Sequence, residues 1–555
     1  MRESSPRLPS IDGVLNELDQ RQAAARIWSR DPSLWMEDSG HQDEIRQRLG
    51  WLTLPGDMRR HLPDLEVFAR EVREAGIRHV VLCGMGGSSL APEVMRITFG
   101  SAPGHPRLWV LDTTDPATIA RVASEAPPAE TLYLVSSKSD GTIEVDSLFR
   151  YFYGLVEGAG ILDPGSHFAA VTDPGTGLEA RAREKGFRKV FLNPPDIGGR
   201  YSALSLFGLV PAALIGLDVG RLLDSAEEMA RACAPEVPSQ DNPGLWLGAI
   251  LGGMTAEGRD KLTLLASPGL SSFGLWVEQL IAESTGKEEK GIVPVAGEPT
   301  VDPIYYGKDR FFVYSRVDGE DNSSLDQFVV KLDAAGQPGF SLRLADLYDL
   351  GGEFFRWEFG TAVAGAVLGI DPFDQPNVQG SKEITGQLLT QYTGSRILPA
   401  TPPDMSDEGL SLYGARGESM EAALKEWLDQ ADPGDYIALM AYLEMSEENN
   451  QALAALRRQV LGWTGCATTL GYGPRFLHST GQLHKGGPDS GLFIQLTADD
   501  PVALAIPDRA YDFGVLKSAQ ALGDYQALQR HGRKAISIHL GSDVVGGLHR
   551  LARSM

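Results

Sequence analysis

The stretch VVLCGMGGSSLAPEV, residues 80–94, carries the clearest fold signal in this 555-residue sequence. An apolar run leads into Gly84, Gly86 and Gly87, two serines and a segment compatible with a helix. Glycines let the backbone approach an anion closely, and the helix that follows offers free N–H groups and its positive dipole end. The pattern predicts a strand, a glycine-rich turn and a helix. Such a turn suits a phosphate or a nucleotide, and it also occurs as a tight turn without a ligand.

A second polar loop follows another apolar run, in LVSSKSDGTIEV at 134–145. Three hydroxyls and one cation fall within this loop, at Ser137, Lys138, Ser139 and Thr142. This set suits the oxygens of a phosphomonoester, and it equally suits a solvated loop with a helix N-cap. Two such loops at the carboxyl ends of strands in one parallel sheet favour a shared anion pocket.

Short β-branched runs alternate with helical stretches around these loops. The first series comprises IRHVVLC, RLWVLDTT, TLYLVSSKS, FAAVTD and KVFLN. A second series, KLTLLASPG, IVPVAGEP, FFVYSRV and FVVKLD, begins after a polar stretch at 234–242 and closes with an apolar helix at 357–368. Alternation of this kind predicts parallel sheets with helices on both faces. The expected fold class is α/β, with two three-layer αβα lobes.

The two ends of the chain have a different organisation. Residues 1–60 place apolar side chains at three- and four-residue intervals, which predicts helices. TPPDMSDEG at 401–409 is typical of a linker, and DYIALMAYL, CATTLGYG, LFIQLTA and AISIHL beyond it predict further strands, with a helix near 515–530. The expected domains are a helical arm at 1–60, a first lobe at 61–230, a second lobe at 231–400 and a C-terminal α/β segment at 401–555.

The amino-acid composition disfavours several kinds of partner and site. Lys and Arg number 50 against 74 Asp and Glu, so the net charge is −24, which disfavours nucleic acid and acidic membrane surfaces. The three cysteines have no CxxC spacing, which indicates neither a disulfide framework nor a zinc site. No signal peptide or long apolar run is found, so we expect a cytoplasmic protein without a membrane partner.

Three further motifs follow the two loops in order: DIGGRYSALSLFGL at 196–209, EQLIAESTGK at 278–287 and FDQPNVQGSK at 373–382. Together, the five resemble the phosphoglucose isomerase family and, more broadly, the sugar isomerase (SIS) domain family. The resemblance covers roughly residues 76–385. It implies two SIS-type lobes, an aldose–ketose isomerase acting on a sugar phosphate, and a homodimer.

The resemblance also implies roles for individual residues. Glu283 would be the base that moves a proton between C1 and C2, and Arg200 would stabilise the charge of the enediol intermediate. Lys382 would be the active-site lysine of the third motif. The implied substrate contacts are Gly87, Ser88, Ser137, Lys138, Ser139, Thr142, Gln279 and Gln375. Neither a cofactor nor a metal is expected, because a side chain fills every role.

The sequence departs from the family at the histidine that opens the sugar ring. No histidine lies between Glu283 and Lys382, where the familiar forms carry it. LHSTGQLHKGG, within 471–488, resembles the missing segment, so His478 and His484 are both candidates, and both also suit turns in a glycine-rich loop. This C-terminal part resembles the isomerase half of bifunctional transaldolase–phosphoglucose isomerases. About 75 residues precede the first strand, too few for a transaldolase barrel, so we expect isomerase activity alone.

Two alternative functions remain open at this point. A dual phosphoglucose/phosphomannose isomerase would differ only in how the pocket treats the C2 epimer. A non-catalytic SIS-domain sensor of sugar phosphates would need no base, and the presence of Glu283, Arg200 and Lys382 together with the lack of a basic helix-turn-helix segment disfavours it.

Overall fold

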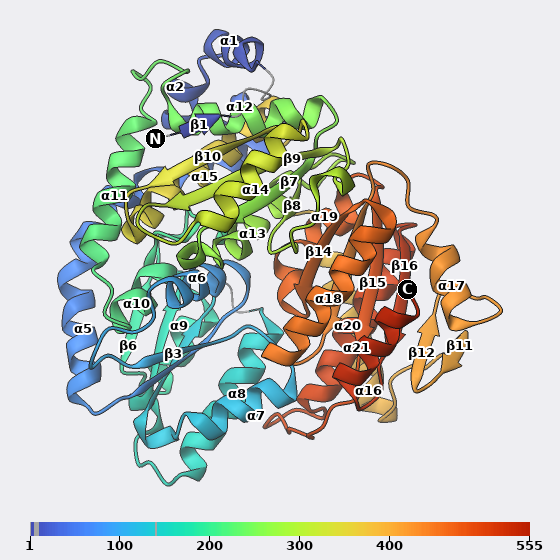
Figure 1. The fold of residues 1–555 in the computed structure, drawn as a ribbon. Helices are drawn as coiled ribbons and strands as arrows, with labels where there is room; N and C mark the ends of the chain where they lie inside the picture. Colours follow the sequence, from blue (N-terminus) through green and yellow to red (C-terminus); the bar gives the residue numbers. More distant parts are fainter. Residues whose placement is uncertain (1, 5–9, 139–140) are drawn as a thin grey trace.

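The structure is a computed structural model that describes residues 2–4, 10–138 and 141–555. Within these ranges the chain forms three β-sheets, each accompanied by helices (Figure 1). The first two sheets lie one above the other in this view, and the third, coloured orange to red, lies beside them. The predicted α/β class is confirmed.

The first sheet has the order β3-β2-β4-β5-β6 and is parallel throughout. Its strands are β2 (His79–Cys83), β3 (Arg107–Leu111), β4 (Thr131–Ser136), β5 (Phe168–Thr172) and β6 (Lys189–Leu192). The helices around it are α5 (Leu62–Glu74), α6 (Leu90–Phe99), α7 (Pro116–Glu125), α8 (Ile143–Gly158), α9 (Gly177–Glu184) and α10 (Leu206–Leu214). Every residue of β4 and β5 is buried, as expected for a parallel sheet covered on both faces. All five strands of the first predicted series are present.

The second sheet has the order β1-β10-β9-β7-β8. Its strands are β1 (Arg2–Ser4), β7 (Lys261–Ala266), β8 (Val293–Val295), β9 (Arg310–Val317) and β10 (Gly339–Leu344). The helices of this part are α11 (Val219–Ala232), α12 (Pro243–Ala256), α13 (Phe273–Thr285), α14 (Ser323–Ala334) and α15 (Leu350–Leu368). The strand predicted at FVVKLD is wrong, because these residues belong to α14. Leu325, Phe328, Val329 and Leu332 recur at helical spacing and pack in one cluster, and the strand lies further on, at β10.

The N-terminal arm is helical, with one addition. Its helices are α1 (Asp12–Gln20), α2 (Ala23–Trp28), α3 (Ser39–Arg46) and α4 (Leu54–Asp57). The unpredicted strand β1 pairs antiparallel with β10, so the arm also extends the second sheet. Trp35 donates to the Ala362 carbonyl of α15, and Trp51 stacks on Tyr201 with ring centroids 5.4 Å apart. The arm therefore supports the segment that carries Arg200.

Helices α12 and α15 pack closely because small residues line their interface. A Cβ atom added at Gly248 would lie 2.4 Å from the Cβ of Val363, and one at Gly252 would lie 2.6 Å from that of Val367. Only glycine permits this approach of the two helices. No helix in the described ranges is both long and apolar enough to cross a membrane.

The third sheet has the order β11-β12-β16-β15-β13-β14. Its strands are β11 (Met405–Asp407), β12 (Leu410–Tyr413), β13 (Tyr436–Tyr442), β14 (Ala467–Tyr472), β15 (Gly491–Thr497) and β16 (Lys534–His539). The accompanying helices are α16 (Gln379–Ser395), α17 (Met420–Leu428), α18 (Glu447–Thr464), α19 (Gly481–Gly486), α20 (Phe513–Arg530) and α21 (Val544–Arg553). The four predicted C-terminal strands are confirmed. The segment 401–409 is not simply a linker, because β11 forms an antiparallel hairpin with β12.

Hydrogen bonds of buried charged side chains and one ion pair fix this C-terminal part against the rest of the chain. Arg457 donates to the Ala296 carbonyl beyond β8, and Glu298 accepts from the backbone of Thr468 in β14. Further along, Arg475 forms a two-bond ion pair with Asp112, at 2.7 and 2.8 Å. The Arg475–Asp112 pair holds the segment 475–478 close to the first sheet, and this segment carries His478.

Candidate active site

Two glycine-rich loops meet beside the carboxyl ends of the first sheet. A Cβ atom at Gly87 would lie 1.9 Å from the carbonyl oxygen of Gly199, so no other residue fits there. Gly86 has a φ of 55°, in the left-handed region that glycine adopts without strain. Their contact brings the turn after β2 against the short 3-10 turn Gly199–Tyr201, which presents Arg200.

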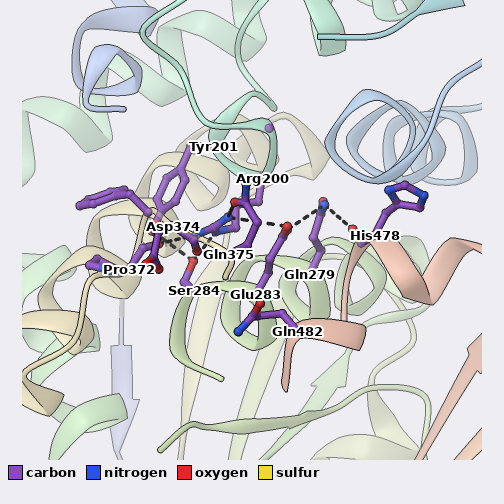
Figure 2. Close-up of polar contacts among 12 residues, drawn as sticks. Arg200, Tyr201, Gln279, Glu283, Ser284, Pro372, Asp374, Gln375, His478 and Gln482 are labelled. Atoms are coloured by element: carbon purple, nitrogen blue, oxygen red, sulfur yellow. Dashed lines mark hydrogen bonds and ion pairs between the residues drawn. The ribbon is translucent and has the colours of Figure 1, made fainter. Parts of the chain in front are cut away.

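Arg200 is the centre of a polar network and has a side chain only 2% exposed (Figure 2). It donates to Ser284 Oγ and to Gln375 Oε1, each at 2.8 Å. It also donates to the carbonyls of Pro372 and Asp374, again at 2.8 Å. All these partners come from α13 or the segment before α16, so Arg200 ties three distant stretches of sequence together.

Glu283 lies on α13 with Oε1 3.7 Å from Nη1 of Arg200. Gln279, one turn earlier on the same helix, donates to Glu283 Oε2 over 3.2 Å and to the backbone carbonyl of His478 over 2.8 Å. The Glu283 side chain is 12% exposed, more than that of Arg200. This carboxylate is therefore held between a cation and an amide while keeping some access to solvent.

Lys287 supports the segment that presents Gln375. It is buried and donates to the carbonyls of Asp371 and Asp374 at 2.7 Å. Burial, followed by the charge of Arg200, lowers the pKa of this lysine. Burial and the neighbouring Asp374 raise the pKa of Asp371 to about 6. The sequence motifs included Lys287 without assigning it a role.

His478 is hydrogen-bonded to a residue that sequence reasoning missed. Its Nε2 lies 3.0 Å from Oε1 of Glu144, the second residue of α8. Burial alone would raise the pKa of Glu144, but the charge and hydrogen bond of His478, together with a backbone hydrogen bond and the charge of Lys382, hold that pKa below its usual value. The only sequence signal for Glu144 was its place two residues after Thr142, in the second polar loop.

A cavity of about 140 Å³ lies beside this pair. It is lined by Gly141, Thr142, Ile143, Glu144, Val378, Ser381, Lys382, Thr385, Gly386, Leu477, His478, Lys485 and Gln520. Lys382 is exposed on α16, and Thr142 precedes α8 without a side-chain cap bond, so its hydroxyl is not used to cap the helix. Glu283 and Arg200 are not among these lining residues. Gln279 connects the two regions through the backbone carbonyl of His478.

The residues predicted to bind phosphate lie in different environments. Ser88 and Ser137 are buried near the ends of β2 and β4. Lys138 is already paired, because its Nζ lies 2.5 Å from Asp173 Oδ2 and 3.0 Å from the Pro195 carbonyl. Ser139 lies outside the described residues. An incoming phosphate would therefore compete with Asp173 for this lysine.

His484, the second histidine candidate, lies in a different environment. It is 4% exposed on α19, packs against the rings of Phe476 and Phe493, and its Nδ1 has no hydrogen-bond partner. Burial and the charge of Lys485 lower its pKa well below 6.5. This geometry favours His478 over His484 for proton transfer.

In the described part of the chain, no cluster of three or more His, Cys, Asp or Glu side chains is arranged to hold a metal ion. The site instead combines a carboxylate held by a buried guanidinium with a histidine held by a second carboxylate. The first pair can remove a proton next to a carbonyl and stabilise the resulting charge, and the second can exchange a proton with a hydroxyl.

The sequence of this chain is similar to those of known proteins. The profile of the family described as phosphoglucose isomerase matches residues 70–310. A glucose-6-phosphate isomerase of Rubrobacter xylanophilus is 30% identical over 385 residues, which cover 60% of this chain and 88% of the relative. One of Thermosynechococcus vestitus is 28% identical, over 73% of this chain and 82% of the relative.

Two solved structures share the fold. A hypothetical protein of Thermus thermophilus matches with a TM-score of 0.57 and 24% identity, over 70% of this chain and 99% of that one. A glucose-6-phosphate isomerase of Chlamydia trachomatis matches with a TM-score of 0.52 and 22% identity, over 67% of this chain and 78% of that one.

Proposed function

The chain belongs to the phosphoglucose isomerase family, and from this premise we propose that it is a glucose-6-phosphate isomerase. The substrates would be glucose 6-phosphate and fructose 6-phosphate, interconverted through an enediol. The observation that carries the proposal is the joining of Glu283 and Gln375 through the buried Arg200 in one polar network, drawn from three motifs spread over 175 residues. We place this activity in the cytoplasm.

Glu283 is proposed as the base for the proton shift. In the open-chain aldose it takes the proton from C2 as the carbonyl oxygen at C1 gains a proton, which gives the enediol. Returning the first proton to C1, with loss of a proton from the C2 hydroxyl, gives the ketose. Arg200 would stabilise the oxyanion that develops, and Gln279 and Gln375 would orient the carboxylate and the guanidinium.

Ring opening is assigned to His478. As the bond between C1 and the ring oxygen breaks, the C1 hydroxyl loses a proton and the ring oxygen gains one, so no net proton is consumed. The pairing of His478 with Glu144 supports this role, because a histidine oriented by a carboxylate is suited to proton exchange. Lys382, on the same cavity, would supply positive charge near the reacting oxygens.

The phosphate group is assigned to the two polar loops. Gly87, Ser88, Ser137, Lys138, Ser139 and Thr142 would contact it. Hydroxyls and backbone N–H groups near strand ends are the usual donors for a phosphomonoester in an open α/β sheet. Lys138 would either exchange Asp173 for phosphate or share its charge between them.

The proposal also includes the division into domains and the oligomeric state. The units are taken as the arm at 1–60, lobes at 61–230 and 231–400, and the C-terminal segment at 401–555. We propose a homodimer in which the base and the histidine of each site come from the same chain.

A coupled assay tests the function. Purified protein is supplied with fructose 6-phosphate, and glucose 6-phosphate is measured with its dehydrogenase; mannose 6-phosphate serves as a parallel substrate. Turnover of fructose 6-phosphate alone supports the proposal, and turnover of both supports the dual phosphoglucose/phosphomannose alternative. Binding of either sugar without turnover would instead identify a sensor.

A further inference from the structure

A buried glutamine of the C-terminal part contacts the pair formed by Glu144 and His478. Gln520 lies on α20, is 2% exposed, and donates from Nε2 to Glu144 Oε1 over 2.7 Å. The same carboxylate oxygen lies 3.0 Å from Nε2 of His478. Gln520 falls outside the residues that match the family profile, and no sequence motif singled it out.

A second contact fixes the orientation of the Gln520 amide. The hydroxyl of Thr114, in the loop after β3, donates to Gln520 Oε1 over 2.7 Å. Because the carbonyl end of the amide accepts from Thr114, its NH2 end faces Glu144. A buried chain of hydrogen bonds therefore runs from the first sheet through α20 to the carboxylate on α8.

These hydrogen bonds determine which ring nitrogen of His478 can exchange a proton with a substrate. An ionised carboxylate only accepts, so His478 Nε2 carries the hydrogen that it donates to Glu144. Nδ1 is then the nitrogen that is left to exchange a proton. Lys382 and Lys485 also line the cavity beside the pair, and Lys485 is paired with Asp524 of α20.

We propose that Gln520 is a positioning residue for ring opening. It holds the Glu144 oxygen that binds His478, and thereby fixes the orientation and the tautomer of the imidazole. This inference rests on the proposed function, because it assumes that His478 opens the sugar ring. Gln520 itself reaches the reaction only through Glu144.

Gln520→Met tests the inference, because it removes both hydrogen bonds while keeping an unbranched side chain of similar length. Gln495→Met is the matched control. Gln495 is also a buried glutamine, 3% exposed, and it bonds the Ala521 carbonyl of the same helix over 2.9 Å without contacting Glu144. Two rates are compared in each variant: turnover of cyclic glucose 6-phosphate, and exchange of the C2 proton in an open-chain sugar-phosphate analogue.

Loss of a hydrogen bond to a charged group should lower turnover of the cyclic sugar about 10- to 100-fold in Gln520→Met, with open-chain exchange within about threefold of wild type. Gln495→Met should leave the ratio of the two rates unchanged. Equal losses of both rates in Gln520→Met, or no loss of either, would overturn the inference.

Gln520→Glu keeps the test decisive if the methionine variant does not fold. Its carboxyl can donate to Glu144 only when protonated, so turnover of the cyclic sugar should recover as the pH is lowered. A wild-type pH profile would count against the proposal. His478→Asn is measured beside it: if wild type is active and His478→Asn shows the split between the two rates but the Gln520 variants do not, only the Gln520 inference fails.

Discussion

Replacing Arg200 by lysine separates the positive charge of this residue from its geometry. The guanidinium makes four hydrogen bonds of 2.8 Å, to Ser284, Gln375, Pro372 and Asp374, and also faces Glu283 at 3.7 Å. A lysine keeps the charge but has three donors on a single nitrogen, and it cannot match the planar fork. Arg200→Lys must therefore lose at least one of these four hydrogen bonds.

The expected magnitude follows from those contacts. A hydrogen bond to a charged group contributes about 1.5–3 kcal/mol, so the loss of one or two of them should lower the free energy of unfolding by about 2–4 kcal/mol. Turnover should fall about 10²- to 10³-fold, since the new ammonium no longer lies where the oxyanion develops. The Michaelis constant should change less, because the phosphate contacts are assigned to other loops.

Urea unfolding and the coupled assay measure the two effects. Arg310→Lys is a matched control, because Arg310 is fully buried and paired with Glu298 but does not contact Glu283. We expect the control to lose stability while its turnover stays close to wild type. If Arg200→Lys kept turnover within threefold of the control, the assigned role of Arg200 in stabilising charge would be refuted.

Three further predictions concern pH, phosphate and metal. Burial raises the pKa of Glu278 from its usual 4.5 to about 8, so the folded chain keeps a proton that the unfolded chain releases, and stability falls as pH rises between those values. The free energy of unfolding in urea, taken as Glu278→Gln minus wild type, should therefore be larger at pH 8 than at pH 5. An equal difference at both pH values would contradict this. Thr142→Ala should raise the Michaelis constant for fructose 6-phosphate about 5- to 10-fold with little change in turnover, and an unchanged constant would move the phosphate site elsewhere. EDTA should leave the rate of the coupled assay intact because side chains fill every assigned role, whereas inactivation reversed by one divalent ion would be contrary to the mechanism.

Most strands were predictable from the sequence because short β-branched runs between glycine-rich loops favour a strand over other structures. The strand prediction at FVVKLD was wrong because a short apolar run fits either a strand or one face of a helix. Tertiary packing stabilises the helix, because Phe328 and Leu332 of α14 pack against the second sheet. Strand β1 was missed because its pairing partner, β10, lies over 330 residues away.

The candidate site was predictable where a residue belongs to a local motif. Glu283, Arg200 and Gln375 each sit in one, and the structure brings them together. Glu144 and Gln520 were missed because their significance lies in contacts with residues 334 and 376 positions away in the chain. No local pattern contains such pairs, and only the fold brings them into contact.

The most direct test of Glu283 as the catalytic base is the exchange of the C2 proton. Glucose 6-phosphate deuterated at C2 is incubated with wild type and with Glu283→Gln, and loss of deuterium to water and transfer to C1 are followed by NMR. The proposed mechanism predicts that wild type moves the label and that Glu283→Gln, which keeps the shape but not the basicity, is slower by about 10²- to 10⁴-fold with substrate binding retained. Near-normal movement of the label in Glu283→Gln would contradict the assignment of the base.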